Sequence, residues 1–127
     1  IKTALKKYCD EIQFRTIPDH STENFDSIIF SFDRVEKAQA VLAALKKQGV
    51  GTKNIPDALK WHFAGDWEHM FHDHPSYQNN FAHQWPETTD LLSRSVALPV
   101  MVSWGETSIS TYLHKLKDAF SFMGVCI

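Results

Sequence analysis

The sequence has few of the residues that build metal clusters, disulfide frameworks and membrane spans. Its only cysteines, Cys9 and Cys126, are too few for a CxxC redox motif or a dense disulfide framework. One bridge between them is an alternative, but reduced thiols in a cytoplasmic protein are the simpler interpretation. The longest uninterrupted apolar run, residues 96–102, is far shorter than the roughly 20 apolar residues of a membrane span. The charged N-terminal stretch also lacks the apolar segment of a signal peptide.

The sequence also has no large excess of positive or negative charge. Thirteen basic and 15 acidic residues leave a formal charge of −2, which argues against a protein that binds nucleic-acid backbones. Hydrophobic residues make up 43% of the 127 residues and charged residues 22%, a balance typical of a folded chain with a buried core. We therefore expect residues 1–127 to form a single small domain.

The first half of the chain alternates between helical and extended patterns. A Lys- and Leu-rich helix is expected at residues 1–8, and period-two alternation predicts strands at residues 12–17 and 27–32. The next helix has Asp33 as its expected N-cap, Glu36 as the capping-box partner, and Gly49 as its C-terminal stop.

The second half is less regular. Residues 50–85 have no sustained period, although a short helix is expected at residues 67–71. Pro86 fits the first turn of a helix that runs to Arg94, and residues 96–102 are expected to form a buried strand with Pro99 at an edge or end. An apolar stripe then predicts a final helix, capped by Thr107 or Ser108 before it and by Gly124 after it; the stripe comprises Ile109, Tyr112, Leu113, Leu116, Phe120 and Met123.

This order of elements predicts an α+β fold of two layers. We expect about three mostly antiparallel strands, covered by helices on one face. Such a sheet leaves edges and a second face unprotected, so we also expect a large partner surface on another domain or another chain.

Histidines are the most unusual feature of the central stretch, which contains His62, His69, His72, His74 and His83. Three of them, His69, His72 and His74, lie near Glu68, but the spacing is not HExxH and no cysteine is close, so we expect solvated or interface residues and no metal site. His62 stands between two aromatic residues. It fits either a hydrogen-bond donor to a substrate or a packed core histidine, and residue types do not decide between them.

Motifs of nucleophilic catalysis and phosphate binding are missing. The sequence has no GxSxG elbow and no complete glycine-rich phosphate loop, since Gly49 and Gly51 follow a helix and do not precede one. The tryptophans fit core packing or an interface more readily than stacking on a sugar or base. We therefore assign no catalytic residue in this chain.

Three stretches resemble a known family. These are LAALKKQGVGT (residues 42–52), KWHFAGDWEHMF (residues 60–71) and LLSRSVALPV (residues 91–100). Together they are similar to the small C-terminal domain of DegT/StrS-type sugar aminotransferases, which are fold-type I enzymes dependent on pyridoxal phosphate (PLP). The middle stretch is most similar to members that act on an eight-carbon acidic keto sugar. Residues 100–104 depart from the family's usual ending after Leu-Pro.

The resemblance implies a function for the whole protein. It implies transfer of an amino group, from glutamate, to a keto sugar such as 8-oxo-3,8-dideoxy-manno-octulosonate in lipopolysaccharide biosynthesis, by a cytoplasmic homodimer. Its PLP and Schiff-base lysine would belong to a large domain that precedes these residues, so the chain is expected to be a fragment with no cofactor-binding residue. The alternative is a freestanding α+β module that binds a partner without catalysis.

The resemblance also implies which residues face the substrate. The loop that begins at Lys53 and Asn54 would form one wall of the substrate pocket, with His62 as the histidine that faces the cofactor. Trp61 would pack on the sugar, and Lys53 and Lys60 would meet its carboxylate.

Overall fold

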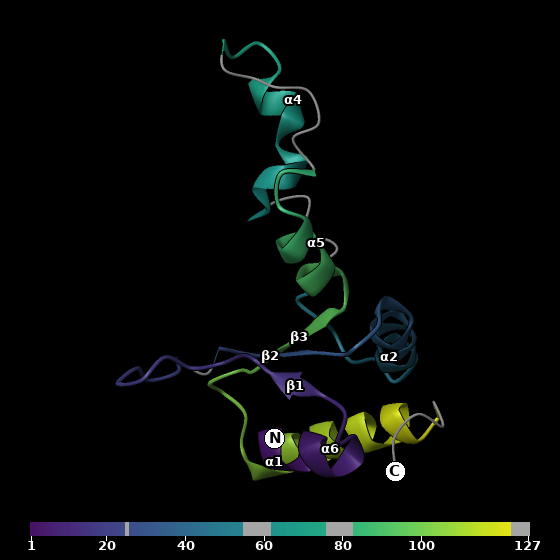
Figure 1. Cartoon of the computed structure of the whole chain (residues 1–127). Coiled ribbons are helices and arrows are strands. Elements are labelled where there is room, and N and C mark those ends of the chain that lie inside the picture. Colours follow the sequence, from purple (N-terminus) through teal and green to yellow (C-terminus); the bar gives the residue numbers. More distant parts are fainter. Residues whose placement is uncertain (25, 55–61, 76–82, 123–127) are drawn as a thin grey trace.

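The fold is a three-stranded sheet with helices beneath it and a projecting helical segment (Figure 1). The computed structural model describes residues 1–24, 26–54, 62–75 and 83–122. The elements in chain order are α1 (Lys2–Tyr8), β1 (Gln13–Phe14), β2 (Ser27–Ser31), α2 (Val35–Lys47), the 3-10 helix η1 (Ala64–Asp66), α4 (Glu68–Phe71), α5 (Pro86–Ser93), β3 (Ser95–Pro99) and α6 (Glu106–Ser121).

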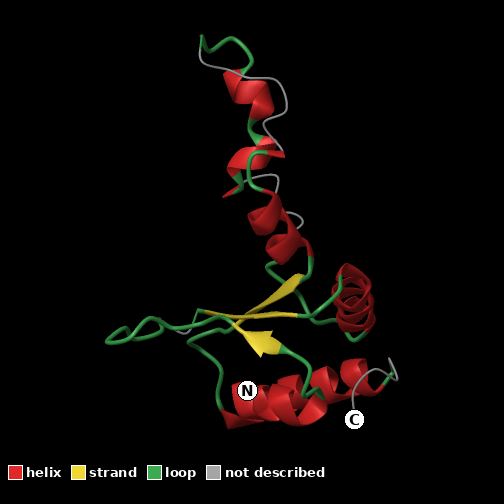
Figure 2. Cartoon of the chain, in the orientation of Figure 1, coloured by secondary structure: helices red, strands yellow, loops and turns green. Residues whose placement is uncertain are grey.

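The sheet has the order β1-β2-β3 and both of its pairings are antiparallel. Gln13 pairs with Ser31 across the first ladder, and the second ladder runs from Ser27 opposite Pro99 to Ser31 opposite Ser95. Figure 2 shows these strands in yellow between α1 and α6 on one side and the projecting helices on the other. The predicted α+β fold with three antiparallel strands is confirmed.

The core lies between the sheet and the helices α1, α2 and α6. Period-two alternation turns Ile28, Phe30 and Phe32 to this side, where all three are buried. Phe30 packs edge-on against Phe32 with ring centroids 5.8 Å apart, and its ring centroid lies 6.3 Å from that of Phe120 on α6. Burying each such side chain contributes about 1.5–3 kcal/mol, so this layer holds the domain together.

The second face of the sheet is covered only in part. Ile29 and Ser31 on β2 lie beside Ala97 and Ser95 on β3, and Leu91 and Leu92 of α5 line a cavity over this face. The Ser95 hydroxyl donates a hydrogen bond of 2.6 Å to the carbonyl oxygen of Leu91. Part of the cover expected for this face therefore comes from the chain itself.

A helical arm projects from the sheet on the side opposite α1 and α6 (Figure 1). We call the described residues 62–75 and 83–94 the arm and the remaining described residues the body. Within the arm, the Phe63 and Trp85 rings meet edge-on at 6.2 Å, and Gly65 is buried against the Phe63 ring. The predicted helices at residues 67–71 and from Pro86 onwards are confirmed as α4 and α5.

The predicted N-cap of α2 is wrong, whereas its predicted C-terminal stop is confirmed. The N-cap is Arg34, which makes no side-chain cap hydrogen bond, and the predicted cap Asp33 forms an ion pair with Lys37 instead. Gly49 follows the helix with a φ of 66°, a left-handed conformation that glycine adopts without a Cβ penalty. The side chain of Asp33 thus pairs with a lysine and leaves the backbone N–H groups of the first turn uncapped.

The predicted strand at residues 96–102 ends early. β3 stops at Pro99 because its partner strand β2 begins at Ser27, opposite Pro99. One further bond of 2.9 Å runs from Val100 N to the Asp26 carbonyl oxygen, and beyond it Met101 and Val102 are exposed. The last helix then starts at Glu106 with Gly105 as its N-cap, so neither Thr107 nor Ser108 caps it. The predicted positions at Met123 and Gly124 lie outside the described residues.

The expectation of reduced thiols is also wrong. Cys9 is buried at the end of α1 and takes part in a disulfide. The sequence has one other cysteine, Cys126, which lies outside the described residues. No helix in the described part of the chain is long and apolar enough to cross a membrane.

Candidate functional site

The candidate residues Lys53 and Asn54 lie at the free edge of β3. After the turn at Gly49, the chain runs beside this strand, and the Lys53 backbone N–H donates to the carbonyl oxygen of Ala97 at 2.9 Å. The residue directly after stretch 42–52 therefore meets stretch 91–100, which is far away in the sequence. Both stretches carry the family resemblance.

The side chain of Lys53 contacts an acidic residue that the sequence did not single out. Its Nζ lies 3.4 Å from Asp26 Oδ2, and more than half of each side chain is exposed. A hydrogen bond from Ser27 and the neighbouring Lys53 together hold the pKa of Asp26 below its ordinary value. Because exposed ion pairs contribute little, Lys53 can exchange Asp26 for another carboxylate at small cost.

Asn54 has an unusual environment for an amide. Its Oδ1 is buried and has no hydrogen-bond partner among the described residues. Leaving a buried acceptor without a donor costs about 1–3 kcal/mol, so this oxygen is a point where a donor would stabilise the fold.

The other candidate residues are not brought to this edge in the described structure. His62 is exposed, which rules out the alternative of a packed core histidine. Among the described residues, no hydrogen bond or ion pair joins His62 to Lys53 or Asn54. Lys60 and Trp61 lie outside the described residues.

The histidines near α4 bind backbone groups of the arm. The carbonyl oxygens of Asp66 and His69 accept hydrogen bonds from Nδ1 of His69 and His72, at 3.2 and 3.0 Å. His72 Nε2 lies 3.1 Å from Asp73 Oδ2. Within residues 1–24, 26–54, 62–75 and 83–122, no group of three or more metal-ligating side chains is placed to hold a metal ion.

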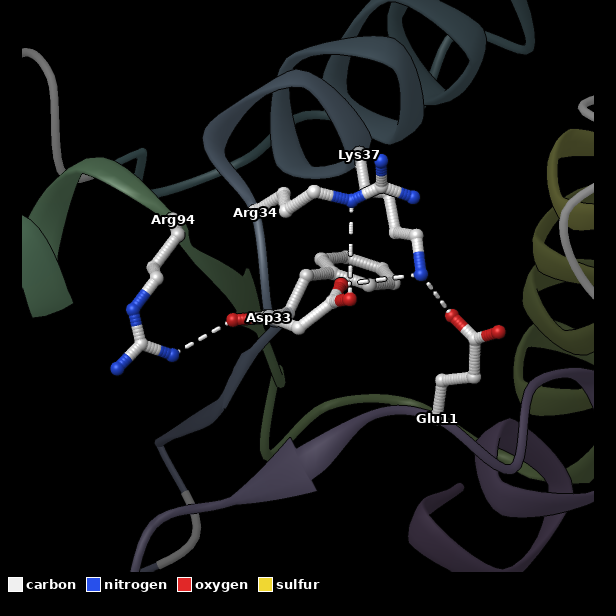
Figure 3. Close-up of polar contacts among 6 residues, drawn as sticks. Glu11, Asp33, Arg34, Lys37 and Arg94 are labelled. Carbon is white, nitrogen blue, oxygen red and sulfur yellow. Dashed lines mark hydrogen bonds and ion pairs between the residues drawn. The ribbon is translucent and has the colours of Figure 1, made fainter.

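A polar cluster at the start of α2 joins two parts of the body (Figure 3). Lys37 Nζ contacts the carboxylate of Glu11 and lies 3.0 Å from Asp33 Oδ1. The Lys37 ammonium lowers the pKa of Asp33, while hydrogen bonds to Glu11 and then Asp33 raise the pKa of Lys37. The cluster fixes the α1–β1 connection to α2, which is a structural role.

Arg94 fixes the root of the arm to the sheet (Figure 3). Its Nη1 donates to the carbonyl oxygen of Phe32 at 2.6 Å, and its Nε donates to Asp90 Oδ2 at 2.9 Å. The backbone adds a hydrogen bond of 3.0 Å from Phe32 N to the Arg94 carbonyl. These contacts set the direction in which α5 leaves the sheet.

Two cavities lie apart from Lys53 and Asn54. A mostly apolar cavity of about 390 Å³ separates the second face of the sheet from α5 and is lined by residues that include Ile29, Leu91 and Leu92. A shallower one of about 310 Å³ on α6 is lined by residues that include Trp104 and Tyr112. Burial raises the pKa of Tyr112 to about 12, and its hydroxyl has no hydrogen-bond partner in the described structure.

Known protein families give no independent assignment, because no family model matches the chain. The chemistry of the site therefore has to be argued from its own residues. Sequence reasoning selected Lys53 and Asn54 but missed Asp26, which is distant in the sequence and lies in no recognisable motif. Asp26 directly precedes β2, and the pairing of β2 with β3 brings it close to Lys53, which lies beside β3.

Proposed function

We propose that the chain is the small domain of a PLP-dependent sugar aminotransferase that moves an amino group from glutamate to an acidic keto sugar. The observation that carries the proposal is the hydrogen bond between Lys53 N and Ala97 O, which holds the residue directly after the first resemblance stretch against the last stretch. If both stretches come from the same kind of domain, the turn after α2 is expected to lie beside β3, as it does here.

The edge of β3 supplies one wall of the proposed substrate pocket. Lys53 would leave Asp26 and bind the carboxylate of the sugar, since a charge-assisted hydrogen bond contributes about 1.5–3 kcal/mol. A sugar hydroxyl would donate to the buried oxygen of Asn54. Trp61 and Lys60 would extend this wall, and His62 would lie closest to the cofactor.

The cofactor would be bound by other parts of the protein. PLP, when bound, supplies the electron sink for amino transfer. Among the candidate residues with a described position, the one lysine is Lys53, and it lies exposed against Asp26 and not in a buried cofactor site. The chain's own residues would therefore orient the sugar and exclude water, as one half of a cytoplasmic homodimer.

The test uses the full-length protein expressed from its intact gene. We expect the visible absorbance of bound PLP, bleaching of that absorbance by glutamate, and amino transfer to an eight-carbon acidic keto sugar. Lys53→Ala should raise the KM for the sugar about tenfold or more, the effect expected for a lost charge-assisted hydrogen bond.

Two matched variants make the role of Lys53 specific. Asp26→Asn removes the competing carboxylate and should lower the KM for the sugar. Lys117→Ala removes an exposed lysine from α6 and should leave the KM unchanged. A full-length protein that binds no PLP and transfers no amino group would refute the proposal, and an unchanged KM in Lys53→Ala would remove this residue from the pocket.

A second candidate function is a partner-binding module without catalysis. It is favoured by the arm, where Met70, Trp85 and Leu91 are large apolar side chains exposed to solvent. PLP binding by the full-length protein discriminates between the two, because the module has no use for the cofactor.

A further inference from the structure

The arm has an acidic and partly apolar surface. Residues 62–94 contain five histidines but a single lysine or arginine, Arg94, whose guanidinium is bound to Asp90 and to the Phe32 carbonyl. Met70 on α4 is 61% exposed and Leu91 on α5 is 47% exposed. The acidic residues of this segment are Asp66, Glu68, Asp73, Glu87 and Asp90.

The body has a surface of opposite charge where α2 and α6 end. We call Lys46, Lys47, Lys115 and Phe122 the α2–α6 patch. Lys47 Nζ lies 5.2 Å from the centre of the Phe122 ring, and Lys115 Nζ lies close to Gly49, just after α2. Phe122 is 75% exposed, and within the described part of the chain none of these three lysines forms an ion pair.

One acidic residue lies near this patch on the same helix. Asp118 is one turn from Phe122, and its Oδ2 lies 3.7 Å from His114 Nε2. A single carboxylate against three ammonium groups leaves the patch positively charged. Its combination of lysines and an exposed aromatic ring complements a surface that carries carboxylates and a methionine.

The arm and the patch of one molecule lie on opposite sides of its sheet. In Figure 1 the arm with α4 and α5 rises from one side, and α6 lies on the other. Arg94 holds the root of the arm to β2, which fixes this arrangement. The complementary surfaces can therefore meet only between two molecules.

We propose that two copies of this chain associate by reciprocal exchange, with the acidic arm of each docked on the α2–α6 patch of the other. A two-fold axis makes this contact twice, which closes the assembly as a dimer. Met70 packs against Phe122 of the partner subunit, and the carboxylates of Asp66 and Asp73 lie among the partner's lysines. The inference names the surfaces behind the homodimer of the proposed function and deepens that part of it.

Charge reversal gives the sharpest test, read by sedimentation of the full-length protein. An arm variant carries Asp66→Lys with Asp73→Lys, and a patch variant carries Lys46→Glu with Lys47→Glu. Each alone places like charges together at both contacts, so we expect a dissociation constant about 100-fold higher. An equimolar mixture should form a heterodimer, because the reversed arm meets the reversed patch and the unchanged arm meets the unchanged patch.

Two controls separate this contact from general effects of charge. Lys115→Glu should weaken the dimer, whereas Lys117→Glu makes the same change outside the patch on α6 and should not. Higher ionic strength should weaken the wild-type dimer. A wild-type protein that is monomeric at tens of micromolar, or a mixture that fails to associate, would overturn the proposal.

These readouts do not depend on activity. Loss of PLP binding with an intact charge-dependent dimer would refute the aminotransferase proposal alone. An active enzyme whose dimer dissociation constant is unchanged by both charge reversals would refute the exchange alone. A patch that captures a nucleic acid and does not rescue the arm variant would also overturn the exchange in favour of an anionic ligand.

Discussion

The body and the arm both contain helices but are stabilised in different ways. In the body, side chains of β2 and of the helices beneath it are buried in one core, where Phe30 and Leu116 are at most 1% exposed. Among the described residues of the arm, only Gly65 is buried. The body is therefore held by long-range burial, and the arm by short-range contacts such as the Phe63–Trp85 pair.

This difference assigns separate tasks to the two regions. A domain whose core is complete without the arm can lose arm contacts and remain folded. An arm with little core of its own keeps apolar and charged groups at the surface, where a partner can use them. We therefore expect substitutions in the body to act on global stability and substitutions in the arm to act on local order and association.

The largest expected effect is loss of stability on truncating the core. Phe30→Ala removes a ring that packs on Phe14, Phe32 and Phe120 across the sheet–helix layer. Large-to-small changes at such sites cost about 3–5 kcal/mol, because they remove buried area and leave a cavity. Equilibrium unfolding in denaturant, followed by circular dichroism, measures this loss.

Met70→Ala is the counterpart in the arm. Met70 is mostly exposed, so its truncation should change the free energy of unfolding by about 0.5 kcal/mol or less in the isolated monomer. Equal losses in the two variants would mean that the arm and the body share one core, and the comparison would fail.

An effect between those of Phe30→Ala and Met70→Ala is expected from Gly65→Ala within the arm. A Cβ at this position would lie 2.3 Å from Cε1 of the Phe63 ring, closer than carbon atoms approach. The ring must move, which disturbs its contact with Trp85 and costs about 1–3 kcal/mol of local stability. Tryptophan fluorescence should change while the far-UV signal of the body is kept.

Gly51→Ala is the matched control for this change. No atom lies within 4 Å of a Cβ built at Gly51, so the substitution is expected to be neutral or slightly stabilising. If both alanine variants leave the tryptophan fluorescence unchanged, the packing of Phe63 on Gly65 does not order the arm.

The body is also the part of the fold that the sequence predicts well. Alternation at Ile28, Phe30 and Phe32 and the helical spacing around Tyr112 and Leu116 mark the two sides of one core, and the structure buries all five. Such periodic signals arise because one face of each element must leave water. The arm has no comparable face, so its sequence predicted short helices but not their projection from the sheet.

Caps and strand ends were less predictable, because they depend on competing partners. Asp33 has the residue type and spacing of an N-cap, yet Lys37 one turn later takes its carboxylate. The apolar run after Pro99 has the composition of a strand, but β2 begins opposite Pro99 and offers this run no partner strand, so Val102 is exposed. Local sequence shows what each residue can do and not which partner it will meet.

The candidate site was predictable only through the family resemblance. That resemblance selected Lys53 and Asn54, and the structure places them at the edge of β3. Neither the contact of Lys53 with Asp26 nor the buried oxygen of Asn54 has a sequence signal, because both follow from tertiary packing. The proposed roles of these residues depend on those contacts.

The smallest effect, and the one with a defined pH dependence, is expected in the polar cluster of the body. Lys37→Gln removes the ammonium that lowers the pKa of Asp33 and that is itself held by Glu11. Asp33 stabilises the fold above its ordinary pKa of 3.8, and this contribution is lost as the pH falls through its lowered folded value. Lys37 stabilises the fold below its ordinary pKa of 10.5, and this contribution is lost as the pH rises through its raised folded value. The variant should therefore be less stable than the wild type between these limits and approach it at both extremes, as measured by unfolding across pH. Lys117→Gln removes an exposed lysine outside the cluster and should show no such profile. A stability difference for Lys37→Gln that stays constant with pH would contradict the ion pairs.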